Sequence, residues 1–123
     1  MRYMLDANAF ILMLAGFPSV AARAAECDEG SIVLSAIAFA EVAHGSARGM
    51  PPSEDVLARA VATIPVLPFD AAAAKAYSRL RFKRGSFDRL IAAHAVAADA
   101  VLVTASLGDF ADVAGLEIED WTQ

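Results

Sequence analysis

The sequence predicts an α/β fold, in which helices cover both faces of a central, mostly parallel β-sheet. Short apolar runs of strand length alternate along the chain with longer, Ala-rich segments of helix length. Residues that start helices stand at the boundaries between the two kinds of segment. Strands that are separated by helices pair in parallel as βαβ units. The length of 123 residues fits a single domain, which we expect to span 1–123.

The first half of the chain contains two predicted strands and three predicted helices. The strands are 2–5 and 31–35, and the helices are 8–15, 18–30 and 36–49. Pro18 is suited to the first turn of a helix, because its missing N–H would be unpaired there in any case. Gly30 is expected to end that helix, and Ser35 to cap the next one.

The second half continues the alternation. The predicted helices are 51–64, 71–82 and 87–100, and the predicted strands are 65–69, 100–104 and 116–120. Glu54 and Asp55 fall in the first turn of their helix, where the helix dipole favours negative charge. Asp70 and Ser86 are expected to cap the two helices that follow them.

Composition points to a soluble, cytoplasmic protein. Apolar residues make up 58% of the chain, but the longest apolar runs, such as 9–17, are shorter than the ~20 residues of a membrane-spanning helix. The N-terminus shows no pattern of a signal peptide. Cys27 is the only cysteine, which excludes an internal disulfide and a zinc site built from cysteines.

The net charge of −5 argues against a non-specific nucleic-acid-binding protein, but the charges are unevenly distributed. Residues 75–89 hold six basic side chains and one acidic side chain. This basic stretch predicts a local anionic partner, or else a solvated helix face.

Acidic side chains are predicted to gather at the edge of the sheet where the parallel strands end. Asp6 follows the first strand, Glu41 lies in the helix after the second, and Asp88 starts the helix before the fourth. Ligands of open α/β sheets bind outside these strand ends. The segment after the fourth strand adds three more polar side chains: Thr104, Ser106 and Asp109.

Three of these acids also have simpler explanations. Asp6 or Asn8 could serve only as a helix cap, which is worth ~1 kcal/mol. Asp88 could serve only as a favourable charge near the positive end of the helix dipole. Asp109 could be a surface turn residue.

Glu41 is harder to explain as a structural residue. The helix around it is apolar on every side, and burying an unpaired carboxylate costs several kcal/mol. Its partner could be Arg48, two turns further along the helix, or a divalent cation shared with the other acids. A site of oxygen ligands alone suits Mg²⁺ or Mn²⁺. Such an ion would activate water for in-line attack on a phosphodiester, without a covalent intermediate.

Four motifs, in order along nearly the whole chain, resemble those of PIN-domain ribonucleases. They are "LDANAFI", "SAIAFAEVAHG", "FDRLIAAHAV" and "LVTASLGDFADVAGLEIEDW". A short chain with these motifs resembles the VapC toxins of bacterial toxin–antitoxin pairs. The resemblance implies a three-layer α/β/α sandwich and a Mg²⁺- or Mn²⁺-dependent endoribonuclease. It also implies a homodimer, inhibition by a cognate antitoxin, and RNA as substrate, with tRNA the common target.

The resemblance also assigns roles to individual residues. Asp6, Glu41 and Asp88 match the metal-binding acids of the family. Its supporting polar positions are matched by Asn8, Ser35 and Thr104.

The chain departs from the family pattern at three places. Ala7 replaces a common Thr, and Ser106 stands where the family has Asn or Asp. Asp109 is therefore a candidate for the fourth catalytic carboxylate. The segment 81–87, before Asp88, is shorter than usual.

The basic side chains Arg81, Lys83 and Arg84 are predicted to bind RNA. His94, two turns beyond Asp88, is expected to pack in the core rather than to bind metal. His44 could orient Glu41. The apolar segments 9–17 and 56–64 favour either a partner groove or a deep core.

Two other functions remain open. "LDAN" also resembles the nucleophile motif of haloacid-dehalogenase phosphatases, but Asn8 replaces their second Asp and no lysine stands at a strand end. A catalytically weak PIN-like module that binds RNA or protein is the other alternative, and Ser106 is the substitution that permits it.

Overall fold

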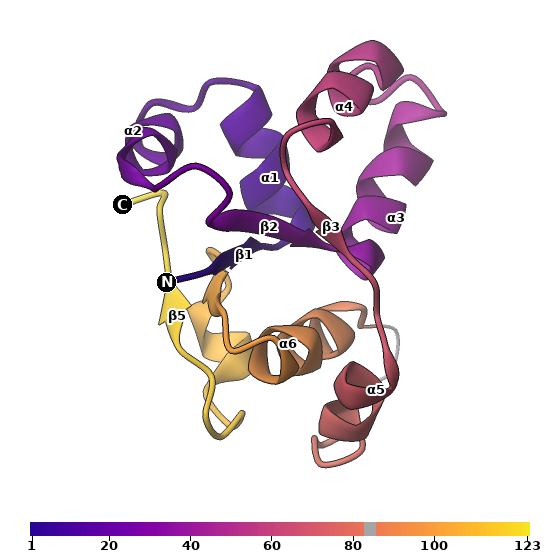
Figure 1. The fold of residues 1–123 in the computed structure, drawn as a ribbon, viewed down its shortest axis with the longest axis vertical. Coiled ribbons are helices and arrows are strands. Elements are labelled where there is room, and N and C mark those ends of the chain that lie inside the picture. The colour runs from indigo at the N-terminus through magenta and orange to yellow at the C-terminus, as the bar shows by residue number, and fades with distance from the viewer. Residues whose placement is uncertain (83–85) are drawn as a thin grey trace.

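Five parallel strands form one central sheet (Figure 1). The structure is a computed structural model and describes residues 1–82 and 86–123. The strands are β1 (Tyr3–Leu5), β2 (Ile32–Ser35), β3 (Val66–Leu67), β4 (Val101–Val103) and β5 (Ile118–Glu119). Their order across the sheet is β3-β2-β1-β4-β5, and every pair is parallel. The predicted sheet is therefore confirmed, and all of its strands are parallel.

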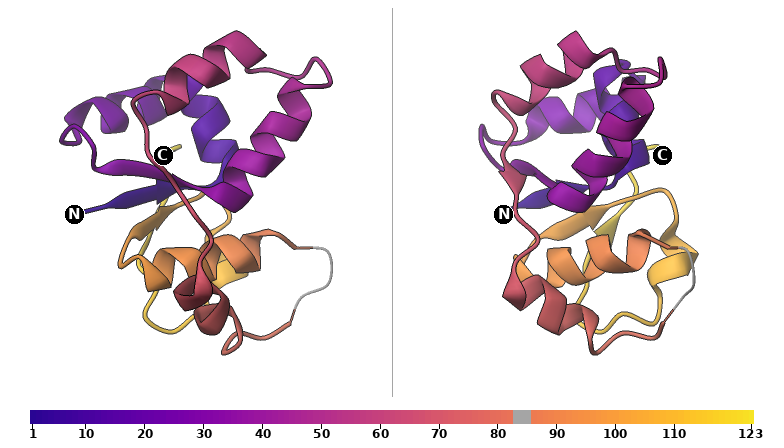
Figure 2. Two further views of the ribbon diagram at one scale, coloured as in Figure 1. Left: turned by 45° about the vertical axis from the view of Figure 1, so that its right-hand side comes forward. Right: turned by 90° about the vertical axis from the view of Figure 1, so that its right-hand side faces the viewer.

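Helices cover the two faces of the sheet unequally. The α-helices are α1 (Ala7–Leu14), α2 (Pro18–Glu26), α3 (Ala36–Ser46), α4 (Glu54–Val61), α5 (Ala71–Tyr77) and α6 (Asp88–Ala97). Helices α1 to α4 lie on one face, and α5 and α6 pack together on the other (Figure 2). The predicted three-layer α/β/α arrangement is confirmed. A short 3₁₀ helix, η1 (Leu107–Phe110), was not predicted.

Most of the predicted helix starts are found in the structure. Asp6, Ser35 and Asp70 each accept a hydrogen bond from a backbone N–H in the first turn of the helix they cap, at 2.8, 3.1 and 3.0 Å. The prediction for Ser86 was wrong. Phe87 is the residue that precedes α6, and no side chain among the described residues caps this helix.

The core lies between the sheet and both helical layers. The apolar side chains of the central strands β1, β2 and β4 are almost fully buried except for the partly buried Tyr3 and Ile32, as expected for parallel strands covered on both faces. Six of the ten residues of helix α6 are buried, and three of these six are Ala. This buried helix begins at Asp88 and fixes the position of that carboxylate.

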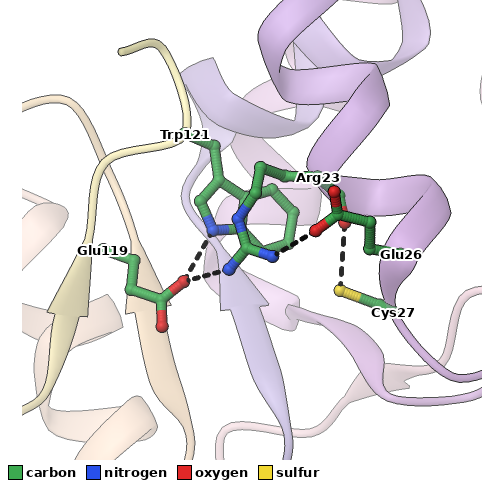
Figure 3. A network of polar contacts seen from close by, with 5 residues as sticks. All are labelled: Arg23, Glu26, Cys27, Glu119 and Trp121. Carbon is green, nitrogen blue, oxygen red and sulfur yellow. Dashed lines mark hydrogen bonds and ion pairs between the residues drawn. The ribbon is translucent and has the colours of Figure 1, made fainter.

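The end of the chain closes the core through Trp121, which is 2% exposed. Its indole N–H donates to Glu119 Oε1 at 2.9 Å, and Arg23 of α2 donates to the same oxygen at 2.7 Å (Figure 3). The Arg23 guanidinium lies 5.2 Å from the centre of the indole ring and also pairs with Glu26. Cys27 donates its thiol to the Arg23 carbonyl. This network joins the C-terminus to α2.

In the described part of the chain, no single helix is long and apolar enough to cross a membrane. Helices α1 and α2 together have the required length and composition, but they are bent by 94° at the break between them.

Candidate active site

Three polar side chains stand in a row across the central strands of the sheet. Leu5 of β1 is in register with Leu34 of β2 and Val103 of β4, so the next positions, Asp6, Ser35 and Thr104, are neighbours. These three residues are buried, with 6%, 0% and 1% of their surface exposed. The register of the parallel strands thus builds one wall of the candidate site.

Asp6 is both a helix cap and a member of this row. Its carboxylate accepts from the backbone N–H of Ala9 at 2.8 Å. Burial raises the pKa of Asp6, and the charges of Asp88 and Asp120 raise it further, although the polar groups of Ala9 and Thr104 act in the opposite direction. Asp6 can therefore cap α1 and also serve as a ligand in the site.

Glu41 lies in the second turn of α3, which Ser35 starts. Its Oε1 atom is buried and has no hydrogen-bond partner among the described residues. Arg48, the simplest expected partner, instead donates to the backbone carbonyl of His44 at 3.0 Å. Loss of solvent raises the pKa of Glu41, and so do the charges of Asp88 and Asp6. Glu41 thus faces two other acids and carries an unsatisfied oxygen.

Asp88 is the first residue of α6 and is half-buried. Burial raises the pKa of its carboxyl group, and the charge of Asp109 raises it further. Asp109 is an exposed residue of η1. Arg89, the next residue after Asp88, donates to the carbonyl of Asp109 at 3.3 Å, so the structure brings the fourth candidate acid close to the start of α6.

Two other predicted polar residues occupy different surroundings. Ser106 is exposed, and its backbone N–H donates to Thr104 Oγ1 at 3.1 Å. Asn8 is also exposed, in the first turn of α1. Asp6 rather than Asn8 starts that helix.

The side chain of His94 contacts the hydroxyl of Ser35. The Ser35 hydroxyl oxygen accepts the N–H of Ile37 and lies 2.8 Å from Nδ1 of His94. His94 also packs edge-on against Phe69, with the ring centres 5.5 Å apart. Burial lowers the pKa of His94, which favours a neutral imidazole. The predicted packing role of this histidine is confirmed.

The basic stretch 75–89 does not form one exposed surface. Arg81 is exposed, but Arg89 is 1% exposed and pairs with Asp112. The expectation that the basic stretch faces an anionic partner or solvent was therefore wrong for Arg89. Lys83 and Arg84 lie outside the described residues.

The acids fit a hard divalent cation in composition. Asp6, Glu41 and Asp88 offer only oxygen ligands, and the unpaired Glu41 oxygen lacks a positive partner. Across 1–82 and 86–123, however, no three His, Cys, Asp or Glu side chains are grouped closely enough to hold an ion as they stand. The acids form a cluster in which neighbouring carboxylates raise the pKa values of Asp6, Glu41 and Asp88. The side chains are not arranged as a complete set of metal ligands.

Residues 3–116 match the PIN domain family. The chain belongs to this family. The resemblance that the four motifs suggested is therefore confirmed. The parallel sheet, with Asp6 after β1 and Thr104 after β4, is the scaffold of a PIN domain.

Relatives over the full length of this PIN domain carry nuclease names. A protein named tRNA(fMet)-specific endonuclease VapC, from Shigella flexneri, is 29% identical over 131 residues, covering 99% of each chain. Ribonuclease VapC2 from Rickettsia felis is 27% identical over 132 residues, and the match covers 98% of each chain.

Two solved structures of similar fold are VapBC complexes bound to DNA. VapBC2 from Rickettsia felis, bound to a DNA fragment from its promoter, matches with a TM-score of 0.82 and 27% identity, over 98% of this chain and 99% of that chain. DNA-bound VapBC from Salmonella typhimurium matches with a TM-score of 0.82 and 28% identity, over 98% of both chains.

Two charged residues near the acids of the PIN domain were missed in the sequence. Asp120 acts on Asp6 through its charge, and its position directly after β5 was an available signal. Asp112 pairs with Arg89, 23 residues away, and no local pattern predicts that contact.

Proposed function

We propose that this PIN domain is an endoribonuclease toxin that hydrolyses RNA phosphodiester bonds with Mg²⁺ or Mn²⁺ and is inhibited by a cognate antitoxin. Full-length relatives named as VapC nucleases support the activity, and the similar VapBC complexes support the antitoxin. The observation that carries the metal dependence is the buried, unpaired Glu41 oxygen beside two further acids.

Asp6, Glu41 and Asp88 are the residues that would hold the cation, with Asp109 or Ser106 completing the site. A bound Mg²⁺ or Mn²⁺ would make a water molecule more acidic and neutralise charge on the scissile phosphate. Such an ion would also offset the repulsion that the three carboxylates exert on one another.

The chain's own residues prepare the site for this chemistry. The N–H of Ala9 binds the Asp6 carboxylate at 2.8 Å and so restricts its orientation. His94 holds Ser35, and Ser35 in turn caps the helix that carries Glu41. Positioned ligands of this kind reduce the rearrangement needed during catalysis.

RNA is the proposed substrate, and tRNA(fMet) is the first RNA to test because of the name of the Shigella flexneri relative. Arg81, Lys83 and Arg84 are the proposed contacts to the phosphate backbone. Such contacts would be weakened by salt, because binding releases counterions from the RNA.

The proposed homodimer remains a prediction from the family resemblance. Phe17, between α1 and α2, is 40% exposed, and the apolar side chains of α1 beyond Phe10 are only partly buried. Light scattering on the purified chain, alone and with its antitoxin, would measure both assemblies.

The decisive experiment is a calorimetric titration of Mn²⁺ into the wild type, Asp6→Asn and Asp28→Asn, with cleavage of tRNA measured on the same samples. Asp28 is exposed and lies in the turn after α2, so Asp28→Asn is a matched control for loss of one charge. We expect the wild type and the control to bind Mn²⁺ and cut RNA, and Asp6→Asn to lose both properties. Cleavage that survives chelation would refute the metal-dependent nuclease.

A PIN-like binding module is the second candidate, because Ser106 replaces a carboxylate or amide of the family pattern. It predicts that tRNA binds to the wild type without being cut at any Mn²⁺ concentration. A gel-shift assay beside the cleavage assay separates this outcome from loss of folding.

A further inference from the structure

Arg89 is a charged residue in an unusual place. It directly follows Asp88 in the first turn of α6, and only 1% of its side chain is exposed. Burying a guanidinium is costly unless it is fully paired, so its contacts should have a structural purpose.

These contacts reach two other segments of the chain. The two Nη atoms each lie 2.9 Å from one oxygen of Asp112, a paired geometry that only arginine provides. Nε donates to the carbonyl of Arg81 at 3.2 Å, and Nη1 donates to the carbonyl of Asp109 at 3.3 Å. One side chain therefore joins α6, the segment after α5 and the 3₁₀ helix η1.

Helix η1 has few other means of staying in place. It has four residues, no side chain of the described residues caps it, and only Phe110 among its residues is buried. Short 3₁₀ segments are weakly stable on their own. The Asp109 carbonyl in η1 accepts from the side chain of Arg89, which directly follows Asp88, so this contact brings η1 to the start of α6.

We propose that Arg89 is a positioning residue, which holds Asp109 beside Asp88 by binding the backbone of η1 and the carboxylate of Asp112. The proposal rests on the proposed nuclease function, in which Asp109 completes the acidic site. In this role Arg89 contacts the protein alone, through Asp112 and the carbonyls of Arg81 and Asp109. It acts through the place that it gives to Asp109.

The test compares four proteins: the wild type, Arg89→Lys, Asp109→Asn and the double variant. Lysine keeps the buried positive charge but cannot form the paired contact with Asp112 while also binding two carbonyls. Arg23→Lys is the control, since Arg23 also forms ion pairs with two partners, Glu26 and Glu119, and neither belongs to the proposed site.

Cleavage of tRNA with Mn²⁺ is measured for each protein well below its melting temperature. We expect Arg89→Lys to lower kcat roughly tenfold, in the range found for residues that orient metal ligands. In the Asp109→Asn background the same change should have little further effect, because its target is already gone. Arg23→Lys should cut like the wild type. The proposal would be overturned if the decreases in kcat of the two single variants multiplied in the double variant. It would also be overturned if Arg89→Lys were as active as the wild type.

A second measurement does not depend on activity. The backbone amides of Asp109 and Val113 donate to the carbonyls of Ser106 and Phe110, so their hydrogen exchange reports on η1. In metal-free Arg89→Lys these two amides should exchange faster, while those of α6 keep their rates. Unchanged exchange would overturn the role of Arg89 even if the wild type proved inactive. An inactive wild type would itself refute only the proposed nuclease function.

Discussion

Replacing Trp121 by Phe should destabilise the protein by an amount that the structure allows us to work out. The change removes about 40 Å³ of a side chain that is 2% exposed, which at the usual cost of a core cavity is about 1 kcal/mol. It also removes the 2.9 Å hydrogen bond to Glu119, worth about 1 kcal/mol. Weaker contact with the guanidinium of Arg23 adds about 0.5 kcal/mol. The expected loss is therefore about 2–3 kcal/mol.

This loss can be measured by urea and thermal unfolding followed by far-UV circular dichroism. For a chain of this length, 1 kcal/mol corresponds to about 4 °C, so the Tm of Trp121→Phe should fall by about 10 °C. Trp121→Ala should cost about 3–5 kcal/mol, whereas Met50→Ala, at a side chain that is 61% exposed, should cost less than about 0.5 kcal/mol. If Trp121→Phe and Trp121→Ala both unfolded within about 0.5 kcal/mol of the wild type, the C-terminus would not be part of the core.

Three further predictions concern the charged groups. Asp6→Asn and Asp88→Asn should abolish RNA cleavage yet leave the metal-free protein at least as stable at pH 8. Because both carboxyls have raised pKa values in the folded state, the stability that they contribute is present below about pH 4 and lost as pH rises through the folded pKa; urea midpoints against pH would test this. His94→Ala should cost about 2–4 kcal/mol by leaving Ser35 without its partner. The pKa of His94 is lowered in the folded state, so its effect on stability depends on pH in the opposite direction. Its contribution to the free energy of unfolding is present above about pH 6.5 and is lost as pH falls through the folded pKa. In His94→Ala the stability should therefore fall less steeply with decreasing pH. The third change replaces Arg81, Lys83 and Arg84 together by Ala. It should weaken RNA binding and flatten the dependence of that binding on salt. An unchanged salt slope in a filter-binding titration would place the RNA elsewhere.

The order of strands and helices could be predicted from the sequence because each element carries its own local signal. Strands of β-branched and other apolar residues end in Asp6, Ser35 or Thr104, and these residues also start or support the helices that follow. The acids Glu41 and Asp88 could be placed for the same reason, since each lies near the start of a predicted helix.

Features that depend on distant contacts could not be predicted. Arg89 looks like one more exposed base in a basic stretch, and its burial follows only from the position of Asp112 in the folded chain. Helix η1 is too short to show a periodic pattern. Arg48 has suitable spacing for a partner of Glu41, but a backbone carbonyl competes for it.

The register of the central strands has a consequence for how this protein tolerates mutation. Asp6 stands beside Ser35 and Thr104 only because Leu5 pairs with Leu34 and Val103. Substitutions on the surface leave that alignment untouched, which agrees with a fold kept at 27–28% identity. Deleting one residue from the three-residue strand β1 would turn Asp6 to the opposite face of the sheet while every acid remained in the sequence. Single-residue deletions in β1 should therefore abolish the site far more often than substitutions of equal size, and a deep mutational scan that includes deletions would reveal the sheet register without a structure.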